Sequence, residues 1–223
     1  MLPVGGRSLV LVAGIPGAGK STLLRSLSPE RRAGLVVVDS DTVREWLAGR
    51  LPHGTPYRLH RPLVHLSHRM RILLAVCSAA PAVLVHLPAT AGWTRCWLAA
   101  AGLLARRDRT LVWFDVDAAE ARRGQRTRGR VLAAGGFGRH ARRAASFTTR
   151  LRAGAGAPGW RVLVVDRSAT LRFAEQVPVA GAAVDAAVDG AAVDGTVVDV
   201  AARRRPGPAA PRTADSATGF PIL

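Results

Sequence analysis

Lysine is almost absent from this sequence, although basic residues are abundant. Lysine and arginine together number 32 among 223 residues, and Lys20 is the only lysine. Aspartate and glutamate number 15, so the formal net charge is +17. A charge of this size can attract phosphate-rich partners through counterion release. A coding bias toward arginine also explains it, and arginines without interleaved aromatic residues usually form a solvated surface. Nucleic acid is therefore a possible partner that composition alone does not favour.

Cysteine and long apolar runs are also scarce. Cys77 and Cys96 lie far apart and lack the spacing of metal ligands. We expect both to be buried, small apolar residues in a reducing compartment. No run reaches the roughly 18 apolar residues that a membrane-spanning helix requires, and the amino terminus shows no export signal. The sequence thus predicts a cytoplasmic protein without membrane association.

Five short apolar runs have the pattern of strands that are buried on both faces of a parallel sheet. They cover residues 8–13, 35–38, 82–87, 110–114 and 161–165. Helical patterns between them cover residues 20–27, 42–49, 59–79, 93–105, 118–126 and 138–152. Strands that alternate with helices of this length favour right-handed βαβ units. The predicted fold class is therefore α/β, with a five-stranded parallel sheet flanked by helices.

The composition changes after residue 176, where a short unit similar to AAVDG repeats. Residues 177–223 contain no aromatic side chain before Phe220, so they can bury little apolar area to offset the entropy of ordering. We expect one domain at residues 1–176 and a disordered tail at residues 177–223. The alternative is that the valines of the tail pack on the domain as an additional strand or helix.

A phosphate-binding motif follows the first predicted strand directly. The segment GIPGAGKST fits the P-loop pattern G-x-x-x-x-G-K-[ST], and a helical pattern follows it, which is the context that supports the motif. Glycines allow successive amides to face phosphate oxygens, lysine meets the β- and γ-phosphates, and the serine hydroxyl binds Mg²⁺. A guanidinium would not replace the compact ammonium of lysine. The predicted nucleotide-binding residues are Gly14, Ile15, Pro16, Gly17, Ala18, Gly19, Lys20, Ser21 and Thr22.

Two carboxylates follow the second predicted strand. Asp39 and Asp41 stand two residues apart at its carboxyl end, where open parallel sheets bind ligands, and Arg44 follows one helical turn later. One carboxylate can accept the proton of an acceptor hydroxyl, and the other can help to hold hydrated Mg²⁺. We assign Asp39 to the metal with Ser21. The alternative is that Asp41 caps the next helix and pairs with Arg44.

The motif GIPGAGKST and the later DSDTVR are similar to motifs of small P-loop kinases, the group of adenylyl-sulfate kinase, zeta toxin, chloramphenicol phosphotransferase and polynucleotide kinase. The resemblance covers about residues 8–172. It implies that Asp41 is the catalytic base and that Arg44 contacts the acceptor. This group often has an acidic residue near the end of the third strand, where this chain has His86, which we interpret as a satisfied, partly buried side chain. Thr90 and Arg95 could line the acceptor pocket.

The resemblance also implies a mobile lid after the fourth strand. The segment from Asp115 is rich in arginine and interrupted by glycine, and lid arginines can stabilise charge on the transferring phosphoryl group. The alternative is a solvated helix end. In this group the loop after the last strand borders adenine. The candidates are therefore Arg126 and Arg130 for catalysis, Arg123 and Arg128 as weaker choices, and Arg167 for base stacking.

The leading functional hypothesis is a phosphotransferase that uses ATP and Mg²⁺ to phosphorylate a hydroxyl of a small molecule. No N-K-x-D motif for guanine is present, so ATP is the default nucleotide. One alternative is a polynucleotide 5′-hydroxyl kinase, in keeping with the positive charge. Another is a regulatory module that binds ATP and has lost most of its turnover. The sequence leaves the acceptor and the oligomeric state open.

Overall fold

The computed structural model describes residues 7–27, 35–39, 42, 46, 49–50, 57–127, 129 and 132–166. Side chains of residues 57–61 are not described. The expected helix at 42–49 falls mostly outside this set, and the expected tail at 177–223 lies wholly outside it.

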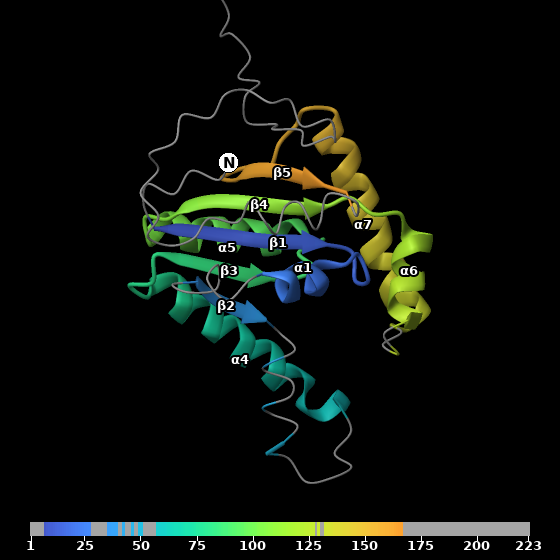
Figure 1. The fold of residues 1–223 in the computed structure, drawn as a ribbon, viewed down its shortest axis with the longest axis horizontal. Coiled ribbons are helices and arrows are strands. Elements are labelled where there is room, and N and C mark those ends of the chain that lie inside the picture. Colours follow the sequence, from blue (N-terminus) through green and yellow to red (C-terminus); the bar gives the residue numbers. More distant parts are fainter. Residues whose placement is uncertain are drawn as a thin grey trace, which may run out of the picture.

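A parallel sheet forms the centre of the fold (Figure 1). Its strands lie in the order β2-β3-β1-β4-β5. In chain order, β2 and β3 are placed on one side of β1, and β4 and β5 are then placed on its other side. This reversal places β1 at the point where ligands bind in open α/β sheets, beyond the carboxyl ends of the strands. The strands are β1 (Ser8–Gly14), β2 (Leu35–Asp39), β3 (Ala82–His86), β4 (Asp108–Phe114) and β5 (Arg161–Val165).

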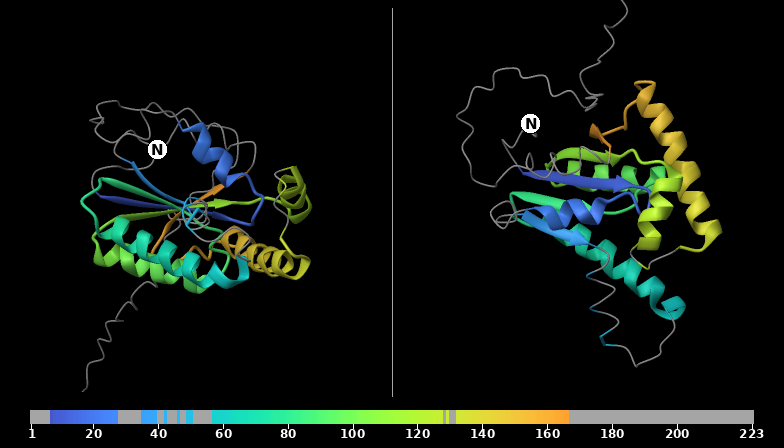
Figure 2. Two further views of the ribbon diagram at one scale, coloured as in Figure 1. Left: turned by 90° about the horizontal axis from the view of Figure 1, so that it is seen from below. Right: turned by 45° about the vertical axis from the view of Figure 1, so that its right-hand side comes forward.

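Helices cover both faces of the sheet. Figure 2 shows α1 on one face and α4, α5 and α7 on the other, while α6 lies beyond the carboxyl ends of the strands. Among the described residues, no helix has the length and apolar character needed to span a membrane. The helices are α1 (Lys20–Ser26), α4 (Tyr57–Cys77), α5 (Gly92–Leu104), α6 (Ala118–Thr127) and α7 (Ala134–Arg152).

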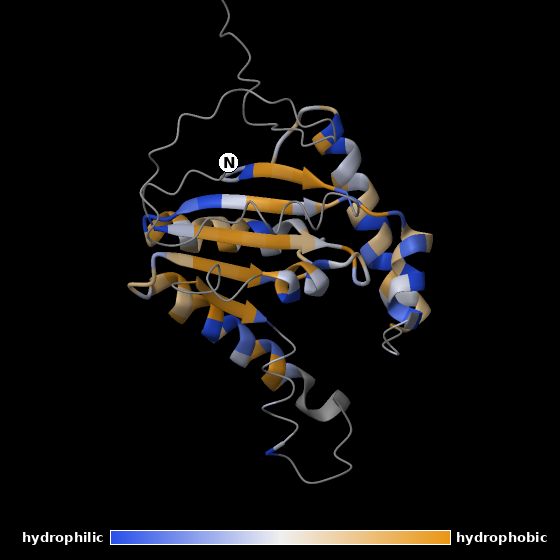
Figure 3. Cartoon of the chain, in the orientation of Figure 1, coloured by the Kyte–Doolittle hydropathy of each residue, from blue (hydrophilic) through white to orange (hydrophobic). Residues whose placement is uncertain are grey.

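The predicted fold class is confirmed by this arrangement. Every residue of β1 is buried, because the strand has neighbours on both edges and helices on its two faces. The apolar colour of the strands in Figure 3 follows the same layer. Predicted and observed strands differ by at most two residues at either end. The largest difference is in α7, which begins at Ala134 and not at Gly138, because the helix continues through Gly135 and Gly136.

An aromatic contact attaches α7 to the sheet. The rings of Trp113 in β4 and Phe147 in α7 meet edge to face with their centroids 4.7 Å apart. The indole Nε1–H of Trp113 also donates to Thr148 Oγ1 at 2.9 Å, so the buried ring has no unsatisfied donor. This packing fixes the position of the helix that carries His140.

The opposite end of the sheet depends on a buried arginine. The guanidinium of Arg107 donates to carbonyl oxygens at the end of α4 and in the turn that follows, which no helical amide reaches. Its acceptors are Val76 O at 2.6 Å, Ser78 O at 2.8 Å, Ala80 O at 2.9 Å, Ser8 O at 3.2 Å and Ala75 O at 3.4 Å.

The expectation that both cysteines are buried is wrong. Cys77 and Cys96 are free and exposed. They lie on the solvent sides of α4 and α5, where the turn of each helix, rather than the apolar character of cysteine, decides which side chains face the core.

Candidate functional site

The P-loop joins β1 to α1 at the centre of the carboxyl edge. Gly14, Gly17 and Gly19 have φ angles of 143°, 95° and 97°, which side chains rarely allow. A Cβ on Gly19 would meet nothing within 4 Å, so its conformation and not its surroundings requires glycine. A Cβ on Gly14 would lie 2.8 Å from Phe114, so there space is limiting as well. The loop is therefore a backbone cradle whose shape needs these glycines.

Lys20 is buried at the base of this cradle, with 4% of its surface exposed. Its Nζ donates to Gly14 O at 3.0 Å and to Ile15 O at 2.8 Å, the first two carbonyls of the loop. An ammonium in so dry a place requires acceptors, and phosphate oxygens are stronger acceptors than neutral carbonyls. The glycine conformations, the buried cation and the hydroxyls of Ser21 and Thr22 at the start of α1 form a donor set that fits a triphosphate with a divalent cation.

Thr90 and His140 lie beside the P-loop. The amide of Gly14 donates to Pro88 O at 3.0 Å, which ties the segment after β3 to the start of the loop. Two residues further on, Thr90 Oγ1 forms a 2.8 Å hydrogen bond with Nδ1 of His140. Burial lowers the pKa of His140 below its ordinary value, and the fields of Arg143, Lys20 and Arg139 lower it further. The charge of Lys20 therefore acts on the protonation of this ring.

Arg95, which was predicted beside Thr90 at an acceptor pocket, lies in the core of the domain. The side chain is buried, with its guanidinium 3.7 Å from the centroid of Phe147, and its Nη1 donates to Ala89 O at 2.5 Å. Ala89 has a φ of 42°, which is unfavourable for a residue with a Cβ. Burial lowers the pKa of Arg95 to about 10, with a further contribution from Arg150. Arg95 thus holds the strained turn that presents Thr90.

Asp39 and His86 face each other at the ends of β2 and β3, where they are register partners. His86 Nδ1 lies 3.0 Å from Asp39 Oδ1, and His86 is buried. The prediction of a satisfied histidine at this position is confirmed. His68 of α4 lies behind the pair, and the pKa of His68 is lowered to about 4, chiefly by burial, although Asp39 opposes the shift. Neither ring nitrogen of His68 has a hydrogen-bond partner among the described residues.

Helix α6, where the resemblance predicts a lid, packs directly on the P-loop. Gln125 is buried, and its Nε2–H donates to Pro16 O at 2.9 Å while its Oε1 accepts from the amide of Leu132 at 2.9 Å. The side chain thus joins the P-loop, α6 and the segment leading to α7. The sequence does not reveal this role, because Gln125 matches no motif and stands among arginines, which are the residues expected to contact phosphate.

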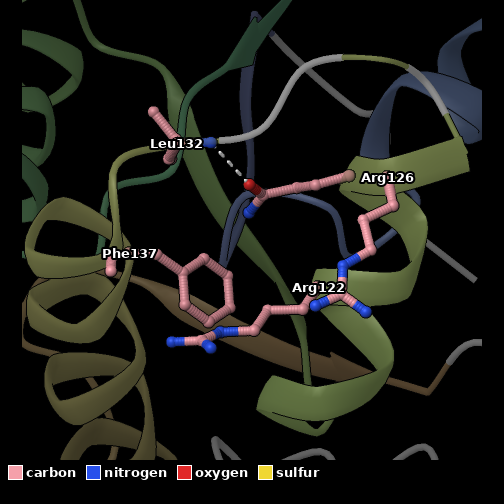
Figure 4. Close-up of a pocket in the computed structure, with 6 residues that line it drawn as sticks. Arg122, Arg126, Leu132 and Phe137 are labelled. Carbon is pink, nitrogen blue, oxygen red and sulfur yellow. Dashed lines mark hydrogen bonds between the residues drawn. The ribbon is translucent and has the colours of Figure 1, made fainter.

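Two arginines of α6 border a pocket of about 160 Å³ between α6 and α7. Figure 4 shows Arg122 extending along the ring of Phe137, with Arg126 on the other side of the pocket. The guanidinium carbon of Arg122 is 4.8 Å from the centroid of that ring. The predicted candidate Arg126 therefore lines this pocket, together with Arg122, which is not among the residues predicted from sequence. The lining is completed by Gln125, Leu132, Ala134 and Phe137.

A family model described as an AAA domain matches residues 9–135, which are more than half of the chain and include the P-loop and α6. The chain belongs to this AAA domain family. No curated protein sequence gives a significant match.

Solved structures share the fold of this AAA domain protein. One comes from the PezAT chromosomal toxin–antitoxin system of Streptococcus pneumoniae, with 14% identity over 74% of this chain and 70% of that chain, and a TM-score of 0.55. Another is a candidate kinase from Chloroflexus aurantiacus, with 13% identity over 78% of this chain and 99% of that chain, and a TM-score of 0.54. At such identities the likeness establishes the fold alone.

Four predicted site residues of the AAA domain protein lie outside the described residues: Asp41, Arg44, Arg130 and Arg167. Arg128 also lies outside them, whereas Arg123 is an exposed residue of α6. In the part of the chain that the structure describes, no three histidine, cysteine or acidic side chains cluster as a metal site would require.

Proposed function

We propose that this protein transfers the γ-phosphoryl group of ATP to a hydroxyl group of a small molecule. The observation that carries the proposal is the buried Lys20 in a glycine cradle at the carboxyl edge, with a lid helix packed on the same loop. Family membership supports nucleotide binding, and the motif DSDTVR, which begins at the end of β2, supports transfer to an acceptor.

The binding roles follow from the placement of each side chain. Lys20 would exchange its two carbonyl acceptors for oxygens of the β- and γ-phosphates. Ser21 would hold Mg²⁺, and Asp39, oriented by its bond to His86, would accept hydrogen bonds from the water of that ion. When bound, Mg²⁺ neutralises charge on the phosphate oxygens. The nucleotide phosphates would thus lie between the P-loop and the ends of β2 and β3.

The transfer step assigns the proton to Asp41. The acceptor oxygen forms a bond to the γ-phosphorus, the bond from that phosphorus to the bridging oxygen of ADP breaks, and the hydroxyl proton passes to the Asp41 carboxylate. Arg44 would orient the acceptor. Arg126 and Arg130 would stabilise charge on the phosphoryl group as the lid closes, and Arg167 would border the adenine.

Phosphate transfer and hydrolysis should be compared directly. ATP and Mg²⁺ are incubated with the wild type and with Asp41→Ala, with and without a panel of hydroxyl metabolites, and both ADP and phosphorylated products are measured. We expect a product that depends on one acceptor class and falls at least about a hundredfold in the variant. Hydrolysis without any phosphorylated acceptor would favour the regulatory module, and unchanged turnover in the variant would remove Asp41 as the base.

A polynucleotide acceptor is the second candidate, because α7 carries exposed arginines next to the site: Arg139, Arg142, Arg143 and Arg150. If this candidate is right, oligonucleotides with a 5′-hydroxyl accept phosphate and their binding weakens steeply with salt. Oligonucleotides that neither bind nor accept phosphate would eliminate it.

A further inference from the structure

The pair of Thr90 and His140 has no role in the mechanism above, although it adjoins the P-loop. Thr90 is buried with 4% of its surface exposed, and its hydroxyl forms the 2.8 Å bond to His140 Nδ1. His140 is half-buried on α7, and Nε2, the other ring nitrogen, makes no hydrogen bond within the described residues. The ring is therefore anchored on one side and available to a ligand on the other.

A hydroxyl partner leaves the charge of the ring undetermined. Thr90 can donate to Nδ1 of a neutral ring and can accept from Nδ1–H of a protonated ring. His86 differs, since its partner is the Asp39 carboxylate, which has no hydroxyl that could either donate or accept. The charge of His140 thus depends on the other groups around it.

Those groups are cationic in the ligand-free protein. Burial lowers the pKa of His140 most, followed by Arg143 on the same helix, Lys20 at the P-loop and Arg139 on the same helix. Within the part of the chain that the structure describes, no carboxylate contributes to this shift, and the segment after β3 provides the neutral Thr90. Burial and these cations therefore both favour the neutral form of the ring before any phosphate binds.

We propose that His140, anchored by Thr90 beside Lys20, is a phosphate-contacting residue that takes up a proton when the triphosphate binds. The inference rests on the proposed function in one respect, that the ligand of Lys20 is a nucleoside triphosphate. Negative phosphate oxygens next to Lys20 offset the cations that keep the ring neutral. The proton comes from solvent, Nδ1–H then donates to Thr90 Oγ1, and Nε2–H donates to a phosphate oxygen.

Proton uptake by His140 would make triphosphate affinity depend on pH. A group that binds its proton more tightly in the complex makes affinity rise as pH falls, by up to about tenfold per pH unit between the free and bound pKa values. Lys20 and the arginines remain charged throughout this range, so they contribute no such slope. Proton uptake therefore separates His140 from the permanent cations of the site.

Calorimetric titration tests the proposal without turnover. A nonhydrolysable ATP analogue with Mg²⁺ is titrated into the full chain at pH 7 in buffers with different ionisation enthalpies. We expect the wild type to take up a fraction of a proton that His140→Gln does not take up. His65→Gln, which changes an exposed histidine of α4, is the matched control and keeps the wild-type uptake. Protons exchanged by the analogue itself are common to all three proteins and cancel in the comparison.

Two further measurements distinguish a specific role of His140 from misfolding of the His140→Gln variant. Thr90→Ser retains the hydroxyl and should behave as the wild type, whereas Thr90→Val should reduce the uptake. The Cε1–H resonance of His140 in the wild type should titrate at a higher pH with the analogue than without it. Equal uptake in the wild type and His140→Gln, or a resonance that does not shift its titration upward, overturns the proposal.

The same data separate this inference from the proposed function. An analogue that binds without proton uptake overturns the role of His140 and leaves phosphoryl transfer in place. Uptake at His140 in a protein that phosphorylates no acceptor supports the role of His140 and removes the transferase. A wild type that binds no triphosphate overturns both.

Discussion

Gly17 of the P-loop and Gly124 of α6 are in backbone contact. A Cβ on Gly124 would lie 2.6 Å from Gly17 O, and a Cβ on Gly17 would lie 2.1 Å from Ala121 O. These distances are too short for any side chain. Helix α6 therefore packs on the backbone of the P-loop, so a shift of one requires a shift of the other.

Gly124→Ala should weaken triphosphate binding although alanine favours helix formation. We expect affinity for the ATP analogue to fall at least about tenfold, because the helix must move away from the P-loop. Titration calorimetry measures the change. Gly135→Ala is the matched control: that glycine lies in α7 with nothing within 4 Å of the added Cβ, so the free energy of unfolding should rise by up to about 1 kcal/mol with affinity unchanged. Equal affinities of Gly124→Ala and wild type would show that the contact is irrelevant to binding.

Lys20→Arg should lose triphosphate binding as completely as Lys20→Met. The ammonium fits between Gly14 O and Ile15 O in a buried site, and a larger planar guanidinium cannot occupy the same space. We expect an affinity loss of about a hundredfold or more in both variants, from charged hydrogen bonds worth about 1.5–3 kcal/mol each. Fluorescence titration with a labelled ATP analogue measures it, with a thermal unfolding curve as the control for folding. Retained binding in Lys20→Arg would mean that position 20 requires charge alone.

Arg107→Ala should destabilise the fold without involving the site. Its removal takes the guanidinium donor from Val76 O and Ala80 O, whereas Ala75 O and Ser78 O keep other donors, and we expect a cost of about 3 kcal/mol in the free energy of unfolding. Chemical denaturation measures this cost. Arg106→Ala, which removes the same charge from the exposed neighbouring position, should change it by less than about 0.5 kcal/mol. A similar loss in both variants would attribute the effect to net charge.

His68 should make the fold sensitive to acid. The pKa of His68 is about 4 in the folded chain and about 6.5 when unfolded, so the unfolded state binds more protons between these values. The stabilisation is complete above pH 6.5 and declines toward pH 4, by up to about 3 kcal/mol.

Denaturation curves at several pH values measure this slope, and His68→Leu should reduce it because leucine binds no proton. A slope that is the same in the variant would place the acid sensitivity elsewhere.

Sequence alone determined the features that depend on residues close together along the chain. The strands, the order of helices and the GIPGAGKST loop follow from apolar runs and glycine spacing, so they were predicted nearly to the residue. The assignment of Asp41, Arg44, Arg130 and Arg167 also began with local motifs, and it stays a prediction because those residues lie outside the described structure.

Tertiary structure alone decided which distant residues meet. Nothing local marks Thr90 as the partner of His140, Gln125 as the link to Pro16, or Arg95 as a core residue. In a chain with so many arginines, a sequence motif cannot distinguish Arg95, which is buried against Phe147, from arginines exposed to solvent. Burial and register make that distinction, because they depend on the packing of α5, α6 and α7 against the sheet, whereas Lys20 was distinguished by its residue type and its loop alone.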